Sequence, residues 1–264
     1  STKNSEKKSC SHLMDEWKTF IFLTGLFSLA MCAMLQTLDP YEPTYQDRLS
    51  IPGIMICPQS DSLCTIFTTT NTQSWDGHTN ALDTLLGPYS DSIHLANNDN
   101  CTPNQYFLQD NNGDVRNNPK ESCQIKQTIL ENCSGTADCT YLYAEDNPCV
   151  IIKMNWIIEF KPGIDTNPAY LSCTGMNDDS KKVGSIAYYP AGGIFNKIYF
   201  PYYGKITQVI YSQLLVVIKF LKPTLNTMMN VECKVVASDV ATYDDQDKFV
   251  GRSFFSLQVI SRAG

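Results

Sequence analysis

The sequence of 264 residues has none of the short motifs that mark common catalytic sites. No G-x-S-x-G, H-E-x-x-H, P-loop or G-x-G-x-x-G pattern occurs, which argues against serine hydrolases, zinc proteases, P-loop proteins and dinucleotide-dependent oxidoreductases. The adjacent acids Asp178-Asp179 and Asp244-Asp245 are typical of solvated turns. Carboxylates from distant loops could still form a hydrolytic pair, but we expect a binding or partner role rather than an enzyme.

Positive charge and histidine are also scarce. The chain has 20 Lys and Arg against 27 Asp and Glu, a net charge of -7, and its densest basic cluster is Lys7-Lys8. Nucleic-acid binding needs a basic stripe to neutralise phosphates, so we expect no nucleic-acid partner. The three histidines are His12, His78 and His94, and no C-x-x-C pair occurs. We therefore expect no metal site and no cofactor.

Long apolar runs are absent except at residues 20–38. This segment, FIFLTGLFSLAMCAMLQTL, carries no charge, and as a helix it would extend roughly 28 Å, close to the hydrocarbon core of a bilayer. A signal peptide competes with this interpretation, but the preceding polar segment is long and no small-x-small cleavage site follows. A buried soluble helix would need a polar face. We predict a transmembrane helix over residues 20–38 and a polar cytoplasmic stub over 1–19.

The charges around this segment predict its orientation. Lysines precede it and acids follow it (Lys3, Lys7, Lys8 and Lys18; Asp39, Glu42 and Asp47). Positive charge favours the cytoplasmic side, so we expect a single-pass type II protein of the plasma membrane, in contact with membrane lipid. Residues 39–56 contain three prolines and are predicted to form an extended stalk, with an extracellular domain over 57–264.

The cysteines support an extracellular location for this domain. Nine of the eleven follow the apolar segment, scattered through the chain, as expected for disulfides formed in an oxidising compartment. Sequons begin at Asn100 and Asn132, which predicts a glycoprotein, although both have cysteine in the middle position.

The pattern of β-branched and aromatic residues predicts a mainly β domain. We expect a short helix over 74–86 capped by Ser74 and stopped by Gly87-Pro88, and a surface loop over 96–120. Strands are predicted from the Val-, Ile-, Phe- and Tyr-rich runs at 150–160, 183–189, 197–200, 214–221, 230–237 and 253–260. Several strands separated by turns, without interleaved helices, favour an antiparallel β-sandwich.

A short segment, YFPYYGK, concentrates four aromatic rings (Tyr199, Phe200, Pro201, Tyr202, Tyr203, Gly204 and Lys205). Pro201 cannot donate to a central sheet ladder, so a regular core strand is a poor explanation. Rigid aromatic area at a turn suits an interface, and filling of the core is the competing interpretation. We expect some rings to point inward and others toward a partner.

Several ordered motifs resemble the β subunits of the sodium/potassium and proton/potassium pumps. The most specific is K-E-S-C-Q-I-K-Q-T-I-L-E-N-C-S-G at residues 120–135. Others follow in the family's order: P-T-Y-Q-D-R at 43–48, P-C-V-I-I-K-M-N at 148–155, Y-F-P-Y-Y-G-K at 199–205, V-E-C-K at 231–234 and D-K-F-V-G-R at 247–252. The resemblance covers about residues 22–262.

The resemblance implies an immunoglobulin-like sandwich stapled by three disulfides, Cys101–Cys123, Cys133–Cys149 and Cys173–Cys233. Cys57 and Cys64 have no family partner and are close enough in sequence to form an additional bridge. Cys139 would then remain a free thiol.

The resemblance also implies a non-catalytic partner of a P-type ATPase α subunit, with a small single-span regulatory subunit as a possible third component. Such a subunit supports folding, assembly and surface delivery of the pump and alters its potassium affinity. The aromatic turn at 199–205 looks like the family's docking surface for the α subunit. Sodium/potassium and proton/potassium exchange both remain open. The alternatives are an adhesion or signalling glycoprotein without a pump and a short form retained in the endoplasmic reticulum.

Overall fold

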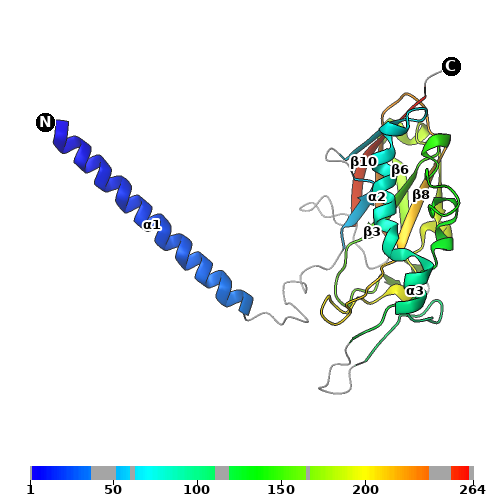
Figure 1. Ribbon diagram of the computed structural model, residues 1–264, viewed down its shortest axis with the longest axis horizontal. Coiled ribbons are helices and arrows are strands. Elements are labelled where there is room, and N and C mark those ends of the chain that lie inside the picture. Colours follow the sequence, from blue (N-terminus) through cyan, green and yellow to red (C-terminus); the bar gives the residue numbers. More distant parts are fainter. Residues whose placement is uncertain are drawn as a thin grey trace. The chain divides into compact units, whose positions relative to one another are not determined.

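The computed structural model describes residues 2–36, 52–59, 63–110, 119–164, 167–237 and 251–261, and in the first of these segments it describes side chains only for 17–35. The chain divides into two compact units, residues 1–47 and 48–264 (Figure 1).

The first unit contains one long helix, α1 (Thr2–Gln36). Within it, Trp17–Leu35 is a 19-residue window of mean hydropathy 1.8 with no buried residue, so the helix is long and apolar enough to cross a membrane. The hydroxyl of Thr24 donates to the carbonyl oxygen of Phe20 at 2.8 Å, which satisfies this polar group inside the helix. The predicted helix is confirmed up to residue 36, while residues 37 and 38 lie outside the described part.

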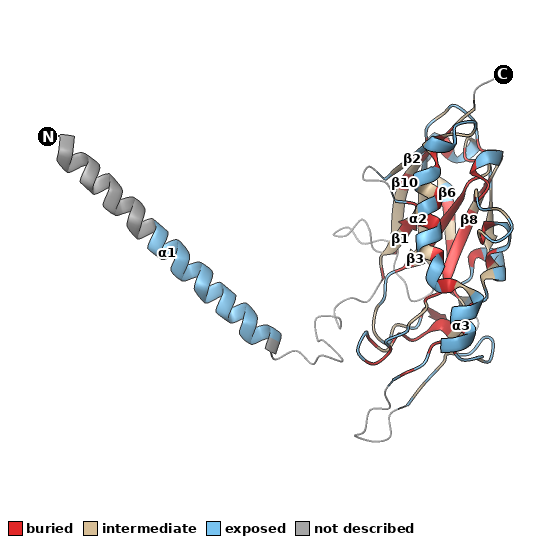
Figure 2. Ribbon diagram, in the orientation of Figure 1, coloured by how far each residue is buried: buried red, intermediate tan, exposed pale blue. Residues whose placement is uncertain are grey.

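The second unit contains two four-stranded sheets. The first has the order β1 (Ile54–Cys57), β3 (Cys149–Met154), β8 (Leu215–Leu221) and β7 (Ser185–Tyr189), and every neighbouring pair is antiparallel. Its central strands β3 and β8 are almost continuously buried, as Figure 2 shows for β8. Their sequences, CVIIKM and LVVIKFL, are accordingly apolar at nearly every position instead of alternating.

The second sheet has the order β2 (Cys64–Thr68), β10 (Arg252–Ile260), β9 (Met229–Val236) and β6 (Tyr170–Gly175). Buried positions alternate along β9, as expected for a strand with one face on the core. The pairs β10–β9 and β6–β9 are antiparallel, but β2 and β10 pair in parallel. The mainly β sandwich is thus confirmed. The expectation of purely antiparallel pairing is wrong for β2 and β10, because strands far apart in the chain are not constrained by a hairpin.

Several predicted boundaries are wrong for identifiable reasons. The predicted strand at 197–200 is a 3-10 helix, η8 (Lys197–Tyr199), since the side chain of Asn196 accepts from the backbone N–H of Ile198 at 3.2 Å and caps it. The predicted strand at 150–160 ends at Met154. The end of the predicted stalk forms strand β1, while residues 39–51 lie outside the described part. Strands β2 and β6 were not predicted. The described part of the chain also contains a two-stranded ribbon, β4 (Gly163–Ile164) and β5 (Asn167–Pro168).

A group of helices follows β2 directly in the chain. They are η2 (Thr72–Ser74), α2 (Asp76–Leu86), η3 (Gly87–Tyr89) and α3 (Asp91–Asn97). Helix α2 buries Thr79, Leu82 and Leu86, a spacing that places all three on one face, and its other side is exposed (Figure 2). The predicted helix is confirmed, but Ser74 does not cap it, because its hydroxyl donates to the carbonyl oxygen of Thr68 at 3.0 Å. The remaining 3-10 helices in the described part of the chain are η4 (Gln127–Cys133), η5 (Tyr143–Glu145), η6 (Asn177–Lys181) and η7 (Ala191–Gly193).

The three predicted disulfides, Cys101–Cys123, Cys133–Cys149 and Cys173–Cys233, are confirmed. Cys173 and Cys233 stand directly opposite each other in the β6–β9 pair, so this bridge staples neighbouring strands. Cys139 is an exposed free thiol, as expected.

The predicted bridge between Cys57 and Cys64 is wrong. Cys57 ends β1 in one sheet and Cys64 begins β2 in the other. The sulfur atoms contact different partners: the thiol of Cys57 donates to the carbonyl oxygen of Ala81 at 3.7 Å, and Sγ of Cys64 lies 3.8 Å from Sδ of Met228. Proximity in sequence is therefore no guide to proximity in space here.

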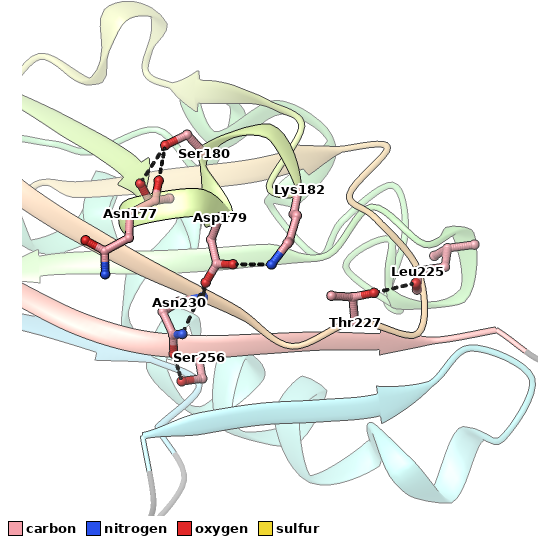
Figure 3. Close-up of polar contacts among 9 residues, drawn as sticks. Asn177, Asp179, Ser180, Lys182, Leu225, Thr227, Asn230 and Ser256 are labelled. Atoms are coloured by element: carbon pink, nitrogen blue, oxygen red, sulfur yellow. Dashed lines mark hydrogen bonds and ion pairs between the residues drawn. The ribbon is translucent and has the colours of Figure 1, made fainter.

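A polar cluster anchors the start of β9 to η6 (Figure 3). The carboxylate of Asp179 accepts from the backbone N–H of Asn230 at 2.9 Å and from Nζ of Lys182 at 2.8 Å. The hydroxyl of Ser256 on β10 donates to Oδ1 of Asn230 at 2.7 Å. The hydrogen bonds and charge of Lys182 lower the pKa of Asp179, so this acid, predicted to face water, has a structural role.

Candidate partner-docking site

The aromatic turn at 199–205 follows η8 and is mostly buried. Tyr199, Phe200 and Tyr202 belong to the buried residues, with only 6% of Tyr202 exposed. Tyr203 is half-buried and Lys205 is exposed. The expected division is therefore unequal, since most of the rings fill the domain and only the end of the turn faces outward.

Hydrogen bonds explain why the tyrosines can be buried. The hydroxyl of Tyr199 donates to the carbonyl oxygen of Gln124 at 3.3 Å, and burial raises its pKa to about 12. The hydroxyl of Tyr203 accepts from the backbone N–H of Gln109 at 2.8 Å and donates to the carbonyl oxygen of Phe107 at 3.4 Å. A buried phenol is tolerated when its hydroxyl finds such a partner, so the turn holds the surrounding loops together.

The buried cation Lys120 contacts the ring of Tyr203. Nζ of Lys120 donates to the carbonyl oxygens of Gln109 at 2.7 Å and Asp110 at 3.1 Å. The same atom lies 5.4 Å from the centroid of the Tyr203 ring, within the range of a cation–π contact. The first residue of the K-E-S-C motif thus fixes the half-exposed tyrosine of the turn.

Residues 206–210 follow the aromatic turn and expose apolar side chains to solvent. Ile206, Val209 and Ile210 are exposed, Val209 by 73%. Gln208 between them is buried: its Oε1 accepts from the backbone N–H of Tyr203 at 3.1 Å, and its Nε2 donates to the carbonyl oxygen of Glu121 at 2.6 Å. Because Gln208 is anchored inward, its apolar neighbours face solvent.

Gly204 makes this geometry possible, since it has a φ of 90°, as its expected role at a tight turn requires. Its carbonyl oxygen accepts from the backbone N–H of Gln208 at 2.8 Å. We refer to residues 199–210 as the docking segment.

Trp156 and Tyr211 form a cluster of three rings with Tyr202 of the docking segment. The ring centroids of Trp156 and Tyr211 lie 5.3 Å and 4.6 Å from that of Tyr202, and Trp156 meets Tyr211 edge-on at 5.5 Å. Trp156 is 42% exposed, so it extends the aromatic surface outward. Sequence reasoning missed the exposed Trp156, because it was placed in the predicted strand at 150–160, which ends at Met154. It also missed residues 206–210, where the available signal was apolar side chains in a segment with no strand pattern.

Both sequon asparagines, Asn100 and Asn132, are exposed. Their central cysteines are disulfide-bonded. Within the described residues, no group of three or more His, Cys, Asp or Glu side chains is placed to hold a metal ion. The arrangement therefore offers contact surface.

Comparison with known proteins identifies the family of this chain. The model of the sodium/potassium ATPase beta chain matches residues 17–255. The sodium/potassium-transporting ATPase subunit beta-2 of Homo sapiens is 42% identical over 284 aligned residues, covering 96% of this chain and 97% of that protein. The beta-2 subunit of Rhinella marina is 36% identical, covering 97% and 98%, and Protein ATP1B4 of Xenopus laevis is 35% identical, covering 91% and 75%. The chain therefore belongs to the sodium/potassium ATPase beta chain family.

Proposed function

We propose that this chain is the non-catalytic beta subunit of a sodium/potassium-transporting P-type ATPase and that its docking segment binds the catalytic α subunit. Family membership makes it an accessory subunit rather than an enzyme. The observation that carries the proposal is similarity to beta-2 subunits over 96% of the chain. The chain itself has a turn that projects apolar side chains. Beta-2 relatives favour sodium/potassium over proton/potassium exchange.

The exposed end of the docking segment is where we place the contact. Ile206, Val209 and Ile210 offer apolar area, while the rings of Tyr199 and Tyr202 hold the backbone in place from behind. Rigid apolar anchors lose little conformational entropy on binding, which concentrates binding energy at such positions. The aromatic turn then acts mainly by shaping the interface.

The subunit would act through binding free energy. Covering extracellular loops of the catalytic chain would remove apolar surface from water and support its folding, assembly and delivery to the plasma membrane. Contacts that differ between pump conformations would shift its potassium affinity by linkage. The type II orientation, with residues 57–264 outside the cell and glycans at Asn100 and Asn132, belongs to the same proposal, as does a small single-span partner.

Co-expression tests this proposal. The tagged full chain is expressed with a sodium-pump α subunit or a gastric proton-pump α subunit, and co-purification and surface delivery are measured. We expect capture of the sodium-pump chain. The double variant Val209→Asp/Ile210→Asp should reduce the captured α chain severalfold, because it places charges in an apolar contact.

The matched control is Ile93→Asp/Leu95→Asp, which changes two exposed apolar residues of α3 and should leave capture intact. If the Val209→Asp/Ile210→Asp variant still captures the α subunit, the docking segment is not the contact surface, but the proposed function as a beta subunit stands. Failure of the folded wild-type chain to capture any α subunit would overturn the function itself and favour the adhesion alternative. Tyr202→Ala is a poor test, because Tyr202 is buried and its loss would create a cavity.

A further inference from the structure

A cavity of about 460 Å³ lies beside α2, between η3 and the strands β1 and β3. Its lining includes Cys57 from β1, Leu85 from α2, Tyr89 from η3 and Lys153 from β3. Cavities that hold small molecules usually measure about 300–1,000 Å³ and have mostly apolar walls with few polar groups. The size and lining therefore fit a small-molecule site.

The cavity is open to solvent on one side. Three residues of the lining are exposed: Trp156, Thr84 and Pro88. Deeper in the lining, Tyr89 is buried, with its hydroxyl donating to the carbonyl oxygen of Gln213 at 3.0 Å. An apolar molecule could thus enter from solvent and cover the Tyr89 ring.

Lys153 supplies the only full charge among the lining residues. Nζ lies 4.7 Å from the centroid of the Trp156 ring, and no carboxylate in the described part of the chain forms an ion pair with it. Burial lowers the pKa of Lys153, which indicates that its charge is not compensated by an acid. A half-buried ammonium on an apolar wall gains most from an anionic ligand group.

We propose that this cavity binds a small aromatic carboxylate, with its apolar body against Leu85, Tyr89 and Trp156 and its carboxylate on Lys153. The charge selects an anion, because a cation would repel Lys153 and a neutral molecule would leave it uncompensated. The apolar walls select a ring system over a hydrated inorganic anion. The proposal concerns the chain alone and does not rest on its assembly with a catalytic subunit.

The thiol of Cys57 provides a readout inside the cavity. The full chain in lipid nanodiscs is treated with iodoacetamide at pH 8, and alkylation of Cys57 and of the exposed Cys139 is followed by peptide mass spectrometry. Burial raises the pKa of Cys57 to about 11, so its reaction will be slow. The probe is 2-naphthoate, and its neutral counterpart is 2-naphthamide.

We expect 2-naphthoate to slow alkylation of Cys57 severalfold without changing that of Cys139, and 2-naphthamide to protect much less. Lys153→Gln should raise the half-protecting concentration of 2-naphthoate about tenfold, while Lys153→Arg should largely preserve protection. Lys219→Gln is the matched control, since Lys219 is a half-buried lysine of β8 in the same sheet.

Three outcomes would overturn the proposal. Cys57 that is far less reactive in the free chain than its raised pKa accounts for, relative to Cys139, would mean that the cavity does not admit solutes. Equal protection by 2-naphthamide, or unchanged protection in Lys153→Gln, would mean that the charge is not recognised. Protection of Cys57 without any probe in the chain co-purified with an α subunit would mean that a protein segment fills the cavity instead. If Lys153→Gln does not fold, the comparison of 2-naphthoate with 2-naphthamide on the wild-type chain still shows whether the cavity recognises the negative charge.

Discussion

At the scale of single residues, buried polar groups do much to determine the local structure. His94 is an example: its Nδ1 accepts from the backbone N–H of Ile125 at 3.0 Å and from Nδ2 of Asn98, also at 3.0 Å. Its ring stacks on Tyr89. A nitrogen that accepts two hydrogen bonds must be unprotonated, so the folded domain requires a neutral imidazole.

We predict that acidification destabilises the domain through His94. Burial lowers the pKa of His94 and of His78, so near pH 6 the unfolded chain binds more protons than the folded one. Stability is then fully present above pH 6.5 and falls as the pH drops below it, by at most about 1.4 kcal/mol per pH unit for each histidine. Urea unfolding of wild type and His94→Gln at pH 7.5 and 5.5 measures this. An equal loss of stability in both proteins would contradict the role of His94.

A second residue-scale prediction concerns Asp179. Asp179→Ala removes the acceptor for the backbone N–H and the side-chain amide of Asn230 and should lower the urea midpoint clearly. Asp178→Ala, its exposed neighbour in η6, should leave the midpoint nearly unchanged. Similar midpoints for the two variants would show that the cluster in Figure 3 contributes little.

At the scale of elements, periodicity and composition predicted the long buried strands well. Strands β8 and β9 lie within one residue of expectation, because their apolar runs are long and bounded by turns. Strand β1 was hidden in a proline-containing segment and β2 has only five residues, so their strand state depends on distant partners. The prediction of a strand at 197–200 was wrong because Asn196 caps a 3-10 turn there.

The candidate site was predictable in position but not in orientation. The motif located the aromatic turn, yet sequence alone could not say that Tyr202 would be buried against Tyr211. That Val209 faces solvent depends on the anchoring of Gln208 by Glu121 and Ser122, residues far away in the sequence. Such contacts arise from tertiary structure and leave no local signal.

The disulfide Cys173–Cys233 between β6 and β9 should stabilise the domain more than a disulfide that closes a shorter loop. Removing Cys173–Cys233, which closes a loop of 60 residues, should cost about 4 kcal/mol in the chain-entropy model, and removing Cys101–Cys123, with a separation of 22, about 3 kcal/mol. The double variants Cys173→Ser/Cys233→Ser and Cys101→Ser/Cys123→Ser are compared by urea unfolding. A larger loss from the shorter loop would show that strain or residual structure outweighs chain entropy.

At the scale of the whole molecule, the proposed type II orientation can be tested by glycan mapping. Digestion with a peptide N-glycosidase should shift the mass of the full chain expressed in animal cells, and Asn100→Gln/Asn132→Gln should abolish the shift. The reason is that only a domain in the secretory lumen meets the glycosylation machinery. An unshifted wild-type chain with reduced cysteines would place the domain in the cytoplasm.

The position of β10 has a consequence for how the molecule is made. This strand follows all the others in the chain, yet it lies inside its sheet, between β2 and β9. During synthesis, β2 therefore has no neighbour until β10 has left the ribosome, and its edge stays unpaired while the intervening residues are translated. The domain cannot complete its core progressively from its N-terminal side. A nascent chain stalled before residue 252 should thus remain bound to chaperones, however much of the sequence has already been translated.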